Sequence, residues 1–113
     1  RLAEGCSMTL AELAALAAEK VPDFKRLVRL ERWVAGERCV VWNDSPAALL
    51  MAVWMLPYKI TRTQQSVKVE RYCERIRGFY ESADFRVIVT QEDAARAALV
   101  ALLRAHGVEV QDA

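Results

Sequence analysis

Glycine, histidine and cysteine are all scarce in this sequence, and each scarcity excludes a class of site. The four glycines lie at positions 5, 36, 78 and 107, so the chain has no glycine-rich loop of the kind that binds dinucleotides or the phosphates of ATP. A single histidine and three scattered cysteines provide no cluster with the spacing of metal ligands. We therefore expect no metal and no cofactor.

The cysteines also indicate a cellular compartment. Cys6, Cys39 and Cys73 are odd in number and form no Cys-x-x-Cys pair. Cysteines of this kind are typical of free thiols in a reducing environment. The sequence thus predicts an intracellular protein, cytosolic or organellar.

Neither an excess of charge nor a long apolar run is present. Sixteen basic and fifteen acidic residues leave a net charge of +1, so no global field would attract nucleic acid or an anionic membrane. The longest apolar run, Pro46 to Pro57, is about half of the ~20 residues that a membrane span requires. This run predicts a buried helix, and we expect no membrane contact.

The length of 113 residues predicts one domain, 1–113, that can bury a single core without disulfides or metals. Residues 1–8 are expected to be flexible. Because the chain starts at Arg1, we expect it to be a piece of a larger protein, with further strands before it.

Two helices are expected in the first third of the chain. Thr9 and Glu12 form a capping box, which predicts a helix from Thr9 to about Lys20. Apolar residues from Phe24 to Val34 mark a second helix, and Gly36 follows as its left-handed C-cap.

A strand and a third helix come next. The segment Arg38 to Trp42 is short, β-prone and bounded by turn residues. Ser45 and Pro46 then provide an N-cap and a first-turn proline for a helix to Leu56. That helix is apolar all round, so it must be enclosed, either centrally in the domain or partly by a partner.

The last half of the chain predicts a β-α-β unit. A capping box at Thr61–Gln64 indicates a helix to Arg77. The next strand is 86–89, the helix is 91–106 and the last strand is 108–110. A crossover of this kind requires parallel strands. The expected fold class is therefore α/β, with a small, mainly parallel sheet of about three strands flanked by about five helices.

In an open parallel sheet, ligands bind beyond the carboxyl ends of the strands, where helix N-termini offer free amides. This rule identifies two turns as a small-ligand site: Trp42, Asn43, Asp44 and Ser45 in one, and Thr90 and Gln91 in the other. The alternative is that Asp44, Ser45, Thr90 and Asp93 are helix caps. His106 precedes Gly107, where a protonated imidazole would favour the helix dipole.

The stretch 31–76 resembles the second half of the dual-specificity and tyrosine phosphatases. In that family a helix and a glycine turn lead to a hydrophobic strand, the phosphate-binding loop, a buried helix rich in Ala, Leu and Met, and an amphipathic helix. The helix 45–56 carries most of the likeness. A rhodanese-like domain, which has its loop at the same position, is a second resemblance. The counterparts in this sequence are Leu30 to Gly36, Cys39 to Val41, Ala47 to Leu56 and Thr61 to Ile76.

The catalytic motif of those phosphatases does not carry over. The family needs His-Cys, five residues that include a glycine, and then Arg before Ser or Thr, whereas this turn is Trp42-Asn-Asp-Ser-Pro46. Cys39 precedes the apolar part of the strand, and Asp44 would repel a phosphate dianion. The resemblance thus implies a pseudophosphatase, and we do not expect an enzyme.

One segment has a local excess of positive charge. Two glutamates accompany a larger basic set between positions 59 and 77. A solvated helix face explains such a set, and contact with nucleic acid or an acidic protein is the alternative. The residues concerned are Lys59, Arg62, Lys68, Arg71 and Arg75.

Three functions follow from these observations. The favoured one is a non-catalytic interaction or scaffolding domain that binds another protein or other domains of the same chain. The second is a small-ligand-binding regulatory domain with its site at the two helix N-termini after residues 42 and 89. The third is contact with nucleic acid through the basic segment 59–77.

Overall fold

The computed structural model describes residues 8–42 and 45–110, with the backbone alone described for 29–34 and 38–42. The chain begins with helices α1 (Leu10–Lys20) and α2 (Pro22–Val28), followed by strands β1 (Arg29–Val34) and β2 (Glu37–Trp42). Helix α3 (Pro46–Trp54) precedes strands β3 (Lys59–Arg62), β4 (Ser66–Cys73) and β5 (Gly78–Phe85), and helix α4 (Gln91–Ala105) comes last.

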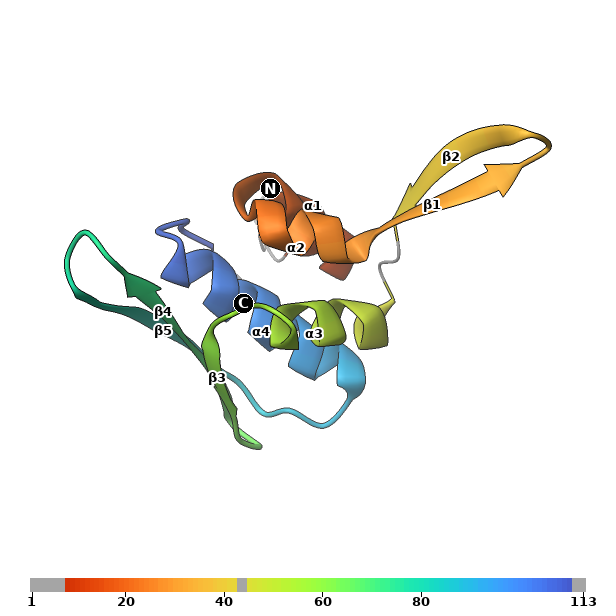
Figure 1. The fold of residues 1–113 in the computed structure, drawn as a ribbon. Helices are drawn as coiled ribbons and strands as arrows, with labels where there is room; N and C mark the ends of the chain where they lie inside the picture. The colour runs from red at the N-terminus through yellow and green to blue at the C-terminus, as the bar shows by residue number, and fades with distance from the viewer. Residues whose placement is uncertain (1–7, 43–44, 111–113) are drawn as a thin grey trace, which may run out of the picture.

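Helix α4 is the centre of the molecule. It packs against β4 and β5 on one side and against α1 and α3 on the other (Figure 1). Five of its residues are alanines without exposed surface, which lets the neighbouring elements approach its axis closely. Leucines of the same helix, together with Leu13 of α1, Leu49 of α3 and Val67 of β4, complete the hydrophobic core.

The three-stranded sheet is antiparallel, in the order β3-β4-β5. Side chains of successive residues alternate between its two faces. Val67 and Val69 of β4 are fully buried on the face that α4 covers. Tyr72 of β4 and Phe79 of β5 are cross-strand neighbours on the other face and are both exposed.

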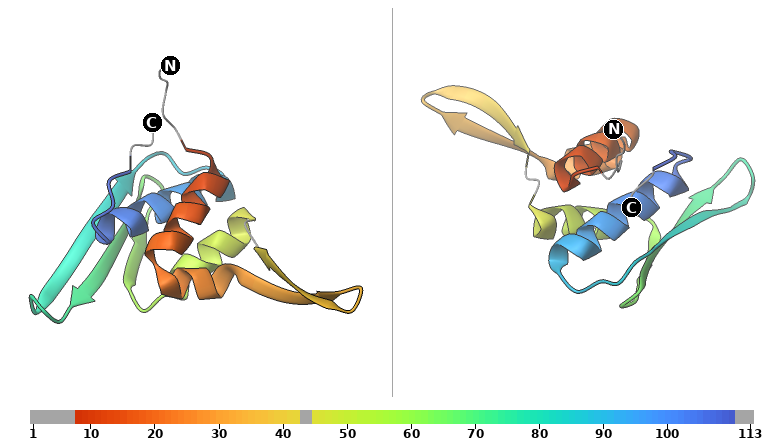
Figure 2. Two further views of the ribbon diagram at one scale, coloured as in Figure 1. Left: turned by 90° about the horizontal axis from the view of Figure 1, so that it is seen from above. Right: turned by 180° about the vertical axis from the view of Figure 1, so that it is seen from behind.

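Strands β1 and β2 form a separate antiparallel hairpin that projects away from the rest of the molecule (Figures 1 and 2). Val34 pairs with Glu37, so Ala35 and Gly36 are the two turn residues. Both have positive φ, 51° and 84°, as a type I′ turn requires. Gly36 therefore serves a hairpin turn and not the end of a helix.

The expected mainly parallel sheet with about five helices is wrong. Four helices, a three-stranded antiparallel sheet and one two-stranded hairpin make up the described chain. Residues 86–89 and 108–110 are not strands, so the predicted β-α-β crossover is not present. The helix predicted within this unit, 91–106, is present as α4, and its end differs from the prediction by one residue.

The predicted helix from Thr61 to Arg77 is also wrong, because this segment contains the end of β3 and the whole of β4. Thr63 belongs to the turn between these strands, where its hydroxyl contacts that of Ser66 at 3.0 Å. The predicted helix ending at Val34 stops at Val28, and the chain continues as β1.

Candidate protein-interaction surface

The two turns predicted to bind a ligand contain helix caps. The Ser45 hydroxyl accepts a hydrogen bond from the Ala48 amide at 3.3 Å. Trp42 ends β2, while Asn43 and Asp44 lie outside the described residues. Figure 1 shows α3 and α4 starting on the same side of the molecule.

The cap of α4 is a complete capping box. The Thr90 hydroxyl accepts from the Asp93 amide at 3.1 Å, and the Asp93 carboxylate accepts from the Thr90 amide at 3.0 Å. Gln91 is the first residue of the helix. The hydrogen bonds from the Thr90 and Val89 amides lower the pKa of Asp93. Its negative charge thus occupies the position that an anionic ligand would take, and ligand binding at this end remains a prediction.

The basic residues between 59 and 77 do not share one face. Lys59 and Lys68 lie on the sheet face opposite α4. Lys59 is in register with Glu70, and Lys68 is in register with Thr61. The Lys68 ammonium is 3.3 Å from Glu81 and 3.7 Å from Glu70, so the charge of this face is balanced.

The other basic residues of this set are placed elsewhere. Arg71 is on the α4 side of the sheet, Arg62 ends β3 and Arg75 lies in the β4–β5 turn. A continuous basic helix face, on which nucleic-acid contact was predicted, is therefore not formed.

Arg71 belongs to a small cluster at the C-terminal end of α4. Its Nε donates to the Ala105 carbonyl at 3.3 Å, and its guanidinium lies 4.9 Å from the centre of the Tyr80 ring. Next to it, the Tyr58 hydroxyl and His106 Nε2 are 2.9 Å apart. Burial, and then the charge of Arg71, lower the pKa of His106, and burial raises the pKa of Tyr58. His106 is the C-cap of α4 and precedes Gly107, and its surroundings favour the neutral imidazole.

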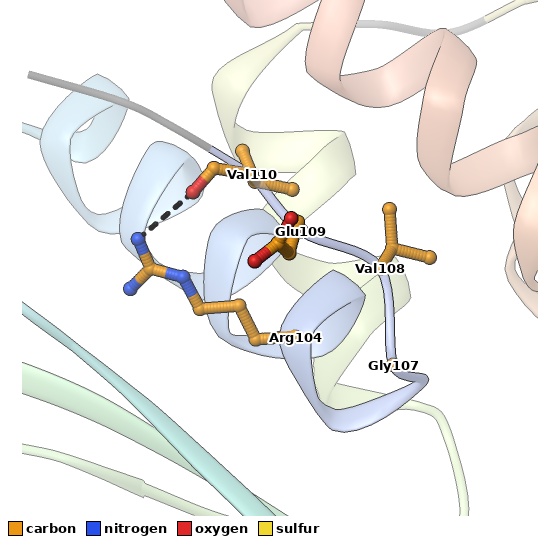
Figure 3. A pocket seen from close by; sticks show the side chains of 5 residues that line it. All are labelled: Arg104, Gly107, Val108, Glu109 and Val110. Atoms are coloured by element: carbon orange, nitrogen blue, oxygen red, sulfur yellow. Dashed lines mark hydrogen bonds between the residues drawn. The ribbon is translucent and has the colours of Figure 1, made fainter.

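A hollow of about 360 Å³ lies beside the segment that follows α4. Figure 3 shows Arg104 on one side of it and the chain from Gly107 to Val110 around it. The Arg104 Nη2 donates to the Val110 carbonyl at 3.0 Å, and its Nη1 is 3.3 Å from Asp84. The arginine is thus occupied in holding the terminal segment against the sheet.

Helix α3 has an apolar outer surface, which we call the α3 surface and which consists of Met51, Trp54 and Met55. These three side chains are 65%, 41% and 64% exposed. The first two are three residues apart and the two methionines four, so they lie on one side of the helix. The opposite side, with Leu49, Ala52 and Val53, is buried.

The charge pattern of α3 differs from that of an ordinary surface helix. Its sequence is Pro46-Ala-Ala-Leu-Leu-Met-Ala-Val-Trp54, without any charged or polar side chain. A surface helix normally carries charged and polar residues on its outer side. On the neighbouring helix α2, Leu27 is also 37% exposed.

Other features of the described chain offer little chemistry. Within residues 8–42 and 45–110, no group of three or more His, Cys, Asp or Glu side chains could hold a metal ion. No helix among these residues is both long and apolar enough to cross a membrane.

The sequence shows that α3 is apolar all round, and this pattern is the signal for the α3 surface. It could not determine which residues would remain uncovered, because this depends on how α2 and α4 pack against the helix.

No protein-family model, no curated protein and no solved structure matches the chain.

Proposed function

We propose that this domain is a non-catalytic protein-interaction domain that binds a protein partner through the α3 surface. The observation that carries the proposal is a helix without a single charged side chain that leaves two methionines and a tryptophan in solvent. An exposed apolar surface of this kind is typical of interaction sites.

The three residue types suit this role. Trp is enriched among the residues that contribute most to binding energy at interfaces, and Trp54 sits between the two methionines in sequence. Met51 and Met55 have flexible, polarizable side chains that adapt to the shape of a partner. The partner surface should therefore be apolar at its centre, since α3 offers it no charge to pair with.

The proposal retains the non-catalytic role and does not depend on the resemblance to phosphatases. Residues 30–36 were expected to match the first helix of that family, but they contain most of β1. Residues 61–76 were expected to match its last helix, but they contain the end of β3 and all of β4.

The test is photo-crosslinking in the cells that make the protein. With p-benzoylphenylalanine in place of Trp54 in every variant, we expect the otherwise unchanged protein to give one discrete crosslinked partner. The double variant Met51→Glu, Met55→Glu should lose stoichiometric capture of that partner, since it introduces two charges into an apolar contact. Phe79→Glu adds the same charge to an exposed aromatic residue on the sheet and should retain capture. Equal capture by all variants would refute the role of the α3 surface.

The non-catalytic part of the proposal has its own test. Titration with an aryl phosphate should give no turnover. Turnover that disappears in Cys39→Ser would contradict it, because this would assign a nucleophilic thiol to the strand before the Asn43 turn.

A further inference from the structure

The segment from Phe85 to Val89 links β5 to α4 along the outside of the molecule (Figure 1). Its apolar side chains alternate in exposure. Phe85, Val87 and Val89 are 81%, 71% and 81% exposed, while Ile88 between them is buried. These three are the most exposed large hydrophobic side chains of the described residues. The segment thus has the side-chain alternation of a half-buried strand.

The backbone of the segment is hydrogen-bonded on one side. The Arg86 amide donates to the Gln65 carbonyl at 3.0 Å and the Ile88 amide to the Gln64 carbonyl at 2.9 Å. Successive amides of an extended chain point in opposite directions, so the Val87 amide points away from the β3–β4 turn. Among the described residues it has no hydrogen-bond partner.

This free side continues the edge of the sheet, because β5 is the last strand in the order β3-β4-β5. An exposed edge with free backbone donors and acceptors matches another extended strand. Natural proteins protect such edges with lysine, proline or bulges, yet the outward-facing positions here are Phe85, Val87 and Val89.

We propose that a second copy of the chain pairs with this edge, antiparallel and two-fold symmetric about Val87. In this register, Phe85 of one copy lies opposite Val89 of the other, and Arg86 lies opposite Ile88. Every exposed apolar residue meets another apolar residue, and no like charges face each other. A register centred on Glu81 would instead oppose two carboxylates, which is destabilising.

The length of this pairing is limited by the start of α4. The Val89 amide donates to the Asp93 carboxylate at 3.2 Å, so the intermolecular ladder ends there. Because both copies use the same residues, the contact is closed and produces a dimer, not a fibre.

The experiment is sedimentation velocity on the full chain, from low micromolar to hundreds of micromolar. We expect a monomer–dimer equilibrium with no larger species. Val87→Lys should give a monomer over the whole range, because a lysine on an edge blocks pairing. Met51→Lys, which places the same charge on the α3 surface, should dimerise like the wild type. Circular dichroism establishes that both variants are folded.

A second measurement on the unmodified protein needs no variant. Amide hydrogen exchange at Val87 should slow by at least tenfold as the concentration rises through the dimerisation range, while exchange at the exposed Glu74 of the β4–β5 turn stays constant. A monomer at all concentrations, an unaffected dimer in Val87→Lys, or open-ended growth would each overturn the proposal. These results leave the α3 surface untouched, because its test uses different residues.

Discussion

Arg104 of α4 and Asp84 of β5 form an ion pair across the interface between the helix and the sheet. The Arg104 Nη1 lies 3.3 Å from Asp84 Oδ1, and Arg86 donates to the other carboxylate oxygen. Asp84 is only 4% exposed and is the one buried charged residue among those described. One carboxylate therefore joins the sheet, the central helix and the segment after β5.

Replacing Asp84 with Asn should strongly destabilise the fold. The change removes the negative charge that pairs with Arg104 and Arg86. We expect the free energy of unfolding to fall by roughly 2–4 kcal/mol, below the full cost of breaking a buried pair because both arginines are partly exposed. Urea denaturation measures this. Glu81→Gln, at the exposed Lys68 pair, should cost about 0.5 kcal/mol or less; equal effects would contradict a special role for Asp84.

Replacing Thr90 with Ala should destabilise α4 at its first turn. The variant loses the side-chain half of the capping box with Asp93, and the loss of such a cap costs about 1 kcal/mol. Thermal unfolding provides the measurement. Gln91→Ala changes the next, exposed residue without removing a cap and serves as the control. A Thr90→Ala variant as stable as the control would show that the cap contributes nothing.

Replacing Arg77 with Asn should stabilise the sheet. Arg77 has a φ of 50° in the turn between β4 and β5, a left-handed conformation that asparagine adopts with less strain than arginine. We expect a gain of about 0.5–1 kcal/mol in the free energy of unfolding. Arg75→Asn removes the same charge from the same turn at a residue without positive φ. It should give no gain, and a gain of equal size there would indicate charge and not backbone strain.

The stability of the protein should fall between neutral and mildly acidic pH because of His106. Its pKa in the folded protein is lowered by burial and by Arg71, whereas in the unfolded chain it is about 6.5. Between these two pKa values the unfolded state binds more protons, so the free energy of unfolding falls as the pH drops below about 6.5. The fall is complete below the folded pKa.

Urea denaturation of the wild type and His106→Gln over a pH series isolates this contribution. The carboxylates of Glu12 and Asp93, whose pKa values are lowered, act at more acidic pH and are common to both proteins. Parallel curves between pH 7 and pH 5 would contradict the prediction.

The helix starts were the part of the fold that could be predicted from sequence. Thr9, Ser45 with Pro46, and Thr90 were identified as caps, and the structure has a helix at each of them. These predictions succeed because a cap is a contact between residues three positions apart and needs no tertiary information.

The sheet could not be predicted because its pattern was ambiguous. In Ser66 to Cys73, Val67 and Val69 alternate with Lys68 and Glu70 as in a half-buried strand, but Val69, Tyr72, Cys73 and Ile76 also fit the spacing of a helix. The Thr61–Gln64 sequence looked like a capping box, whereas Thr63 bonds within a β-turn. Strand pairing decides between the two, and pairing is a long-range property.

The β1–β2 hairpin was missed for a different reason. Its turn residues are Ala35 and Gly36, whereas Asn-Gly is the pair that usually indicates a type I′ turn. The positive φ of Gly36 was anticipated, but a glycine after an apolar segment fits a helix C-cap equally well. The α3 surface shows the same limit, since an apolar helix can be recognised without knowing which side its neighbours cover.

The central position of α4 also governs how the chain can fold during synthesis. The helices α1 and α3 and the strands β4 and β5 all pack against α4, which is translated after every one of them. Until residues 91–105 have been synthesised, the valines and leucines of the earlier elements lack the helix against which they pack. The domain can therefore complete its core only after α4 has been synthesised, and until then the apolar segments that α4 covers are exposed to aggregation.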